Sequence, residues 1–245
     1  MMRPGRLRRP GLLAGAAVAA WFVLAPAVWP ARLWAVVLSV LLPVLAGRQT
    51  RLIGDPETLA RIPVYVSSAL SLWVLALLTV VVAFLSRFTL VSLGLIALPA
   101  LRTLASAGAV TALSIAVLFI MNAARIRESP LATRLIPVSR REKIAFAGLS
   151  VTAGICEEFV FRGFLLHTFS TLWGGTVAVA LSSVVFGGLH AYQHVGGALR
   201  AGLLGALLCM PPLLTGSILP SVIAHAAIDG IAGLFLARRF LSEMA

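Results

Sequence analysis

Long apolar runs alternate with short polar segments along most of the chain. Runs of this kind are typical of helices that cross a bilayer, which takes about 20 residues. We predict eight such helices, at residues 12–29, 33–46, 63–86, 104–124, 144–168, 176–191, 197–214 and 218–237. The second, sixth and seventh are short for a full crossing. Residues 88–102 are predicted to form a helix in the membrane interface.

The start of the chain raises a separate question about the first run. Arginines at positions 3, 6, 8 and 9 precede it, as in the basic start of a secretory signal. No small-residue cleavage site followed by a soluble part is present, so we expect an uncleaved first span. Pro30 and Arg32 predict a tight turn between the first two helices.

Composition narrows the class of protein. Of the 245 residues, 60% are hydrophobic and 11% are charged, against about 25% charged in an ordinary soluble domain. A soluble globule of this size cannot bury so much apolar surface, and disordered chains have the opposite composition. We therefore expect an all-α fold, a polytopic integral membrane protein with about eight transmembrane helices in the lipid bilayer.

The net charge of +12 is explained by topology, without a nucleic-acid partner. With the N-terminus inside, only Arg32, Arg87 and Arg102 fall on the outer side. The inner side receives Arg3, Arg6, Arg8, Arg9, Arg48, Arg51, Arg61, Arg125, Arg127, Arg134, Arg140, Arg141, Lys143, Arg238 and Arg239. Because Lys and Arg gather in cytoplasmic loops, we expect a multi-pass protein of the cell membrane with both termini in the cytoplasm.

A few charged residues interrupt the predicted membrane helices. Glu157, Glu158 and Asp229 are the acidic ones, and each costs a few kcal/mol at the bilayer centre. Such residues are retained when they pair or have a function. All four histidines also follow residue 150. We therefore divide the chain into N-terminal membrane helices without a recognised motif, residues 1–130, and a region that carries the chemistry, residues 131–245.

The first motif is the run from Glu157 and Glu158 to Arg162. On a helix, Glu158 and Arg162 lie one turn apart, which favours a buried ion pair. Glu157 points about 100° away and is left for another partner. The pattern indicates a structural pair beside a reactive carboxylate; the alternative is that all three form one structural network.

Two further motifs place histidines within membrane helices. Phe186 and His190 lie one turn apart, with glycines between them that allow close backbone approach, and His225 and Asp229 are spaced in the same way. With Glu157, they favour activation of water by a general base beside groups that stabilise an oxyanion. Histidines and carboxylates also bind zinc, so the same residues, Glu157, His190 and His225, could instead hold a metal.

The three motifs resemble those of the CPBP family of intramembrane proteases, which includes the type II CAAX prenyl endopeptidases and the bacteriocin self-immunity proteins. The family pattern is EExxxR, then FxxxH, then HxxxN or HxxxD. This chain shows it in Glu157-Glu158 to Arg162, Phe186 to His190, and His225 to Asp229. The resemblance covers about residues 137–240.

The resemblance implies hydrolysis of peptide bonds in membrane proteins or in lipidated, CAAX-like proteins, by a glutamate-type or a metal-dependent mechanism. Because the prenyl-protein members resemble glutamate proteases without metal, we expect no cofactor, with zinc as the alternative. It makes Glu157 the base that activates water and His190 the residue that holds the water. His225 and Asp229 take the positions that stabilise the oxyanion, where prenyl-protein enzymes have Asn in place of Asp229. A protonated Asp229 could donate a hydrogen bond there, and an ionised one could orient His225. The supporting residues are Glu158, Arg162 and Phe186.

Other classes of function use the same residue types. The main alternative is a non-enzymatic membrane scaffold or bacteriocin-immunity protein that binds a partner through the same helices. A proton-coupled transporter is a third class, because carboxylates and histidines within membranes also form proton relays. Such transporters are often built from internal repeats, and this chain shows no detectable repeat.

Overall fold

The computed structural model describes residues 29–49, 58–126 and 129–237, and every element in these ranges is helical. The N-terminal part contains α2 (Trp29–Val36), η1 (Val37–Leu41), α3 (Leu42–Gln49), α4 (Arg61–Leu85), α5 (Ala100–Ala123) and α6 (Pro130–Arg134). The C-terminal part contains α7 (Arg140–Glu158), η3 (Phe159–Leu165), α8 (Leu166–Trp173), α9 (Gly175–Leu189), η4 (Ala191–Gln193), α10 (His194–Leu208), α11 (Met210–Thr215), α12 (Leu219–Ile231) and η5 (Ala232–Leu236).

The predicted fold class is confirmed. Among the described residues, six continuous helical stretches are long and apolar enough to cross a membrane: Trp29–Arg48, Arg61–Leu85, Ala100–Ala123, Arg140–Trp173, Ala191–Thr215 and Leu219–Leu236. Gly175–Leu189 is a shorter apolar helix. These seven correspond to the second through eighth predicted spans. The first predicted span, 12–29, lies outside the described residues except for Trp29.

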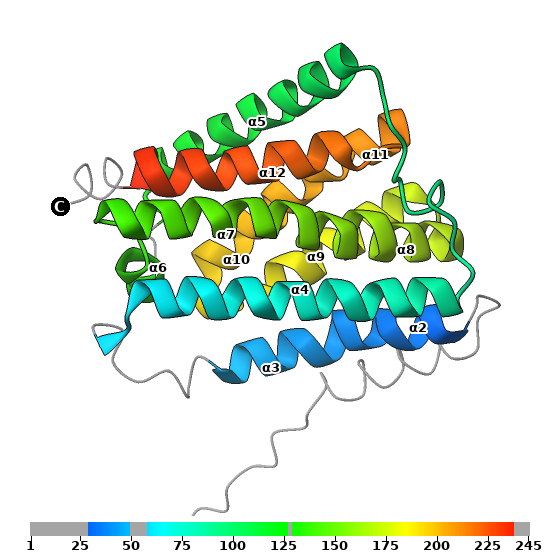
Figure 1. Ribbon diagram of the computed structural model, residues 1–245, viewed down its shortest axis with the longest axis horizontal. Coiled ribbons are helices and arrows are strands. Elements are labelled where there is room, and N and C mark those ends of the chain that lie inside the picture. The colour runs from blue at the N-terminus through cyan, green and yellow to red at the C-terminus, as the bar shows by residue number, and fades with distance from the viewer. Residues whose placement is uncertain (1–28, 50–57, 127–128, 238–245) are drawn as a thin grey trace, which may run out of the picture.

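The helices form one bundle around α7 (Figure 1). In Figure 1, α7 runs between α4 on one side and α12 on the other, and α5 lies beyond α12. Behind this layer, α9 packs against both α8 and α10. Residues from α2 and α4 share a buried apolar core with residues from η3, α8 and α9. Helices from both parts of the chain therefore surround the three motifs.

The start of α7 is fixed by its own sequence and by α4. The Ser139 hydroxyl accepts from the Glu142 amide, while the Glu142 carboxylate accepts from the amides of Val138 and Ser139. This capping box satisfies amides that the first helical turn leaves free, which is worth about 1 kcal/mol. Arg61 at the start of α4 lies 3.3 Å from Glu142. The starts of α4 and α7 therefore lie at the same end of the bundle.

Two local predictions are wrong. Residues 88–99 are turns and irregular chain, and α5 begins only at Ala100. Thr89 and Ser92 exchange side-chain-to-backbone hydrogen bonds, and Gly94 adopts a φ of 68°. These local bonds compete with helix formation. Pro30 and Arg32 lie inside α2, where proline fits the first helical turn because its missing N–H is not needed there.

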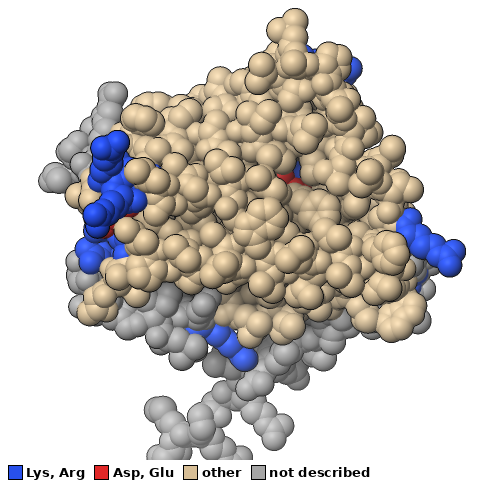
Figure 2. All heavy atoms as spheres, viewed as in Figure 1, with Lys and Arg blue, Asp and Glu red and all other residues tan. Residues whose placement is uncertain are grey.

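The surface agrees with a multi-pass membrane protein. Figure 2 shows most of the visible Lys and Arg side chains at the two ends of the molecule, with one more at its lower edge and an almost uncharged face between the ends. A small patch of acidic atoms is visible between side chains near the middle of this face. Many large apolar side chains on this bundle are exposed, such as Leu101 on α5 and Phe84 on α4. Exposed apolar side chains of this extent require a lipid surrounding.

Candidate functional site

Close helix contacts bring the three motifs together. Gly154 on α7 packs so closely on α12 that a Cβ there would lie 2.7 Å from the Val222 carbonyl oxygen. Gly187 on α9 faces α10 in the same way, with the Ala198 carbonyl oxygen 2.7 Å from an added Cβ. Only glycine allows backbones to approach so closely. The first contact lies one turn before Glu157 and Glu158, and so sets the distance from these carboxylates to α12.

Glu158 lies at the centre of the polar cluster. Its Oε1 atom is 2.8 Å from Nη1 of Arg162 and 2.7 Å from Nδ1 of His225, and its side chain is fully buried. The predicted pair between Glu158 and Arg162 is therefore present. The bond to His225 was not predicted, because it joins residues 67 positions apart. One carboxylate oxygen thus links the first motif to the third.

Arg162 is held by three different groups. Besides Glu158, it donates from Nη2 to the Gly205 carbonyl oxygen of α10 at 3.0 Å. Its guanidinium carbon lies 4.4 Å from the centre of the Phe186 ring, within range of a cation–π interaction. Arg162 belongs to η3, a π-helical segment, and such segments are frequent at functional sites. The buried cation therefore connects α10 and the second motif to Glu158.

Glu157 points away from this pair, as its position on the helix predicted. Its side chain is 15% exposed and lies on the side of His225. Its Oε2 atom is 3.9 Å from Nε2 of His225, and Oδ2 of Asp229 is 3.6 Å from the same nitrogen. Asp229 is the more open of the two, with 39% of its side chain exposed. Two partly accessible carboxylates therefore face one imidazole nitrogen.

His190 reaches the cluster through Phe186. Its Nδ1 atom is 2.8 Å from the Phe186 carbonyl oxygen. The centre of the Phe186 ring is 4.8 Å from the centre of the His190 ring and 6.1 Å from that of His225. A carbonyl oxygen only accepts, so Nδ1 carries the proton and a neutral His190 has its lone pair on Nε2. His190 is thus arranged as an acceptor.

The same argument applies to His225. The carboxylate of Glu158 accepts, so Nδ1 of His225 donates to it. Its Nε2 atom is left to face Glu157 and Asp229. A His225 that also carries a proton on Nε2 can donate from that nitrogen, and a neutral one can only accept there.

The zinc alternative depends on whether the donor atoms converge. In the described part of the chain, no group of three or more His, Cys, Asp or Glu side chains is arranged to hold a metal ion. Both imidazoles have Nδ1 bonded within the protein, to Glu158 and to the Phe186 carbonyl, which would leave Nε2 of each ring for a metal, but the side chains do not converge around one point. The residues as placed do not form a zinc site, so we derive no catalytic step through a metal.

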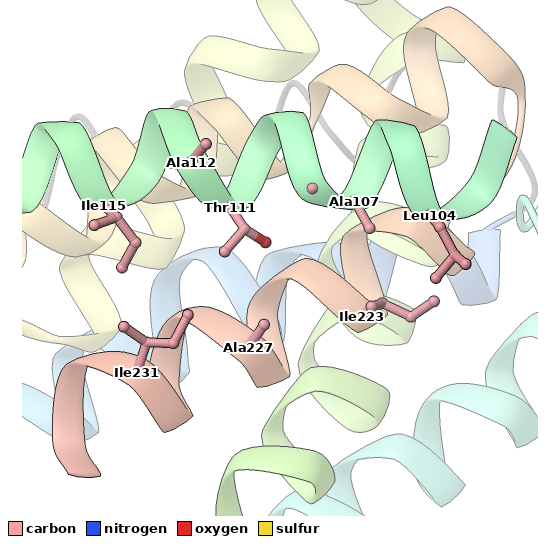
Figure 3. A pocket seen from close by; sticks show the side chains of 9 residues that line it. Leu104, Ala107, Thr111, Ala112, Ile115, Ile223, Ala227 and Ile231 are labelled. Atoms are coloured by element: carbon pink, nitrogen blue, oxygen red, sulfur yellow. The ribbon is translucent and has the colours of Figure 1, made fainter. Parts of the chain in front are cut away.

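The structure separates the remaining candidates from this cluster. His167 packs edge-on against Phe88, with ring centres 4.9 Å apart, and His194 is exposed. Cys156 and Cys209 are buried free thiols. An apolar groove of about 640 Å³ lies between α5 and α12 (Figure 3). Its lining includes Thr111 on one helix and Ala227 on the other, but none of the motif residues.

Sequence reasoning missed two contributors to the site. Gly205 supplies a backbone carbonyl to Arg162 and has no side chain that would signal it. Tyr192 stacks against His190, with ring centres 6.0 Å apart. It stands two positions after His190, where the helix pattern is already broken, so periodicity gave no information about it.

Fold and site together define a polytopic membrane protein with carboxylates and histidines clustered inside its helical bundle. Residues 140–231 match the family model of type II CAAX prenyl endopeptidase Rce1-like proteins. The matched segment runs from the start of α7 to the end of α12 and contains all three motifs. This part of the chain is thus similar to Rce1-like proteins, which agrees with the resemblance to CPBP proteases. The matched family is one of endopeptidases.

Other comparisons give no counterpart. No curated protein and no solved structure matches the chain significantly. The assignment therefore rests on the family match over residues 140–231 and on the geometry of the cluster within it.

Proposed function

We propose that the protein is an intramembrane endopeptidase that cleaves membrane-associated or lipidated, CAAX-like proteins at the site formed by Glu157, His190, His225 and Asp229. The observation that carries this proposal is the convergence of Glu157 and Asp229 on Nε2 of His225, at 3.9 and 3.6 Å, inside membrane helices. Charged residues at this depth are costly, and their partial exposure leaves them accessible to a substrate.

In this proposal, Glu157 is the general base. A water molecule that loses a proton needs hydrogen-bond acceptors around it, and the Glu157 carboxylate and Nε2 of His190 are both acceptors. Glu157 takes the proton, and the hydroxide adds to the carbonyl carbon of the scissile peptide. A positioned general base of this kind contributes about 10²–10⁴-fold to the rate.

His225, oriented by Asp229, stabilises the carbonyl oxygen that becomes negatively charged. A His225 protonated at Nε2 donates a hydrogen bond to this oxygen, while Glu158 holds the ring through Nδ1. Asp229, 3.6 Å from Nε2, keeps the imidazole in place. When the carbon–nitrogen bond breaks, Glu157 returns its proton to the leaving amine, which restores the starting state.

Arg162 and Phe186 support this arrangement without touching the substrate. Arg162 fixes Glu158, and Glu158 fixes His225, so the orientation of the imidazole depends on the buried ion pair. Phe186 contacts the rings of both histidines. Partners of this kind hold reacting groups in a productive geometry.

The substitution that tests the proposal is Glu157→Gln, which keeps the size of the side chain and removes its basicity. With the purified protein in liposomes and a farnesylated peptide ending in a CAAX-type sequence, we expect the cleavage rate to fall about 10²–10⁴-fold. The matched control is Glu142→Gln on the same helix, because glutamine also serves at this position of a capping box. An unchanged rate for Glu157→Gln would remove Glu157 from the mechanism.

We also propose that the reaction needs no metal. Incubation with a strong chelator should leave the cleavage rate unchanged, whereas loss of activity that added zinc restores would establish the metal-dependent alternative. If neither the wild type nor the control variant cleaves any lipidated or membrane-embedded peptide, and Glu157→Gln supports normal cellular function, the non-enzymatic alternative holds.

A further inference from the structure

The short turn after the second motif places an aromatic ring beside His190. Tyr192 lies in η4 (Ala191–Gln193), and its ring stacks on that of His190 with 28° between the planes. The backbone amide of Gln193 donates to the His190 carbonyl oxygen at 2.9 Å, which closes the turn. His190 therefore contacts Phe186 on its own helix and Tyr192 on the turn that follows.

The hydroxyl of Tyr192 has an unused proton. Nε2 of Gln193 donates to the hydroxyl oxygen at 2.9 Å. A phenol has one proton to donate and can also accept, so this bond leaves the proton free. Within the described part of the chain, the hydroxyl has no acceptor for it. The Tyr192 ring lies 6.0 Å from the ring of His190, centre to centre, which places Tyr192 beside the candidate site.

The turn is held in an unfavourable conformation. His194 has φ of 65° and ψ of 179°, a region that residues with side chains rarely adopt. The side chain of Gln193 packs directly against Gly197 on α10. A Cβ at position 197 would collide with it, so only glycine fits there. The strained backbone at His194 and the close packing on Gly197 therefore fix the positions of Tyr192 and Gln193.

Apart from a His225 protonated at Nε2, the proposed site offers no hydrogen-bond donor to a carbonyl oxygen. Ionised Glu157 and Asp229 only accept hydrogen bonds, and Nε2 of His190 carries a lone pair. Activation of water uses acceptors, but the carbonyl oxygen under attack needs donors. The hydroxyl of Tyr192 is a neutral donor, and it belongs to none of the three motifs.

We propose that Tyr192 is a further catalytic residue, whose hydroxyl donates a hydrogen bond to the carbonyl oxygen of the scissile peptide as this oxygen becomes negatively charged, with Gln193 holding the hydroxyl in place. The proton stays on Tyr192 throughout, so the step changes no covalent bond. This inference rests on the proposed endopeptidase function.

The chain offers a matched pair of substitutions, because Tyr65 and Tyr192 are its only tyrosines. Tyr65 donates to the Leu135 carbonyl oxygen at 2.6 Å near the start of α4, away from the three motifs. Removing one oxyanion donor lowers kcat by about 10²–10³-fold. We expect Tyr192→Phe to lose about 100-fold in kcat with KM changed less than about twofold, and Tyr65→Phe to keep the wild-type kcat.

The outcomes separate this inference from the proposed function. If the wild type and Tyr65→Phe cleave and Tyr192→Phe retains more than half of their kcat, the hydroxyl has no catalytic role and stacking on His190 suffices. If the wild type and both variants are inactive, the endopeptidase function itself is wrong. Thermal unfolding of each variant checks that the phenylalanine is tolerated.

A spectroscopic measurement covers the case in which Tyr192→Phe does not fold. In the Tyr65→Phe background, Tyr192 is the only tyrosine, so biosynthetic 3-fluorotyrosine labels this position alone. A peptide aldehyde, whose hydrate resembles the tetrahedral intermediate, should shift the fluorine-19 resonance at saturation. An unshifted resonance with the bound inhibitor would overturn the assignment of Tyr192.

Discussion

Glu158 explains why the first and third motifs depend on each other. A buried carboxylate with one cation is an ordinary structural pair, but here the same oxygen also accepts from His225. Removal of Arg162 or His225 would leave the buried Glu158 carboxylate without one of its partners. The free-energy cost of such an unpaired buried group is larger than the net contribution of the intact pair to stability. The proposed activity and the stability of the bundle therefore depend on the same three residues.

Replacement of Arg162 tests this dependence. Arg162→Met leaves Glu158 buried with only His225 as partner, so we expect the free energy of unfolding to fall by about 3–5 kcal/mol. Arg141→Met, on the exposed first turn of α7, should change it by less than about 0.5 kcal/mol. Thermal unfolding in detergent measures both. If Arg162→Met matches Arg141→Met in stability, the buried pair has no structural importance.

Within single helices, residue-level prediction worked well. The spacing of Glu158 and Arg162 predicted their pairing, and the spacing of Glu157 predicted that it points elsewhere. Such contacts follow from the helical period alone. The bond from Glu158 to His225 could not be predicted, because it depends on how α7 and α12 pack.

At the scale of helices, Gly154 controls the distance between the first and third motifs. An added Cβ would lie 2.7 Å from the Val222 carbonyl oxygen and 3.1 Å from Cβ of Ala226. Both of these atoms belong to α12, one turn before His225 and next to it. A larger residue therefore has to push α12, with His225 and Asp229, away from Glu157.

A pair of alanine substitutions on α7 tests this contact. We expect Gly154→Ala to lower the cleavage rate about 10²-fold, since a displacement of about 1 Å in a reacting group has an effect of this size. Gly148→Ala on the same helix meets nothing within 4 Å. It should keep the wild-type rate and stabilise the helix by about 0.5–1 kcal/mol. Equal cleavage rates for the two variants would contradict the role of this contact.

The connection between α4 and α5 shows why one predicted element was wrong. Its apolar residues suggested an interfacial helix, but its backbone instead forms hydrogen bonds with residues just before α12. Gly94 accepts from the Ile218 amide at 2.9 Å, and Ile96 accepts from the Ser217 hydroxyl at 2.6 Å. Hydrogen bonds to distant residues replaced those of a helix, and local sequence does not reveal them.

At the scale of the whole molecule, the charge distribution suggests an orientation. Arg61, Arg134, Arg140, Arg141 and Lys143 lie together where α4 and α7 begin, and Arg87 lies at the far end of α4. Cytoplasmic loops carry the excess of basic residues. We propose that the end where α7 begins faces the cytoplasm and that Arg87 faces the opposite side.

Cysteine labelling tests this orientation. The native Cys156 and Cys209 are buried, so they should not react with a membrane-impermeant maleimide. Added to intact cells, the reagent should label Arg87→Cys and spare Arg141→Cys, and permeabilised cells should be labelled at both. The reverse pattern would invert the topology, and labelling of both positions in intact cells would show that α4 does not span the membrane.

The sequence by itself determined the class of protein, the approximate helices from residue 33 onward and the residues of the polar cluster. These follow from local patterns: length and polarity define a membrane helix, and spacing defines which side chains share a face. The three motifs also predicted the family that residues 140–231 match.

Only the tertiary structure decided which faces meet. Packing around Gly154 set Glu157 and Glu158 against His225, and packing around α10 gave Arg162 its second acceptor in Gly205. The turn that brings Tyr192 to His190 lies outside any helical period. The physical reason is that hydrophobic periodicity states which face of a helix is buried, while the neighbour it packs against depends on close backbone contacts between residues far apart in the chain.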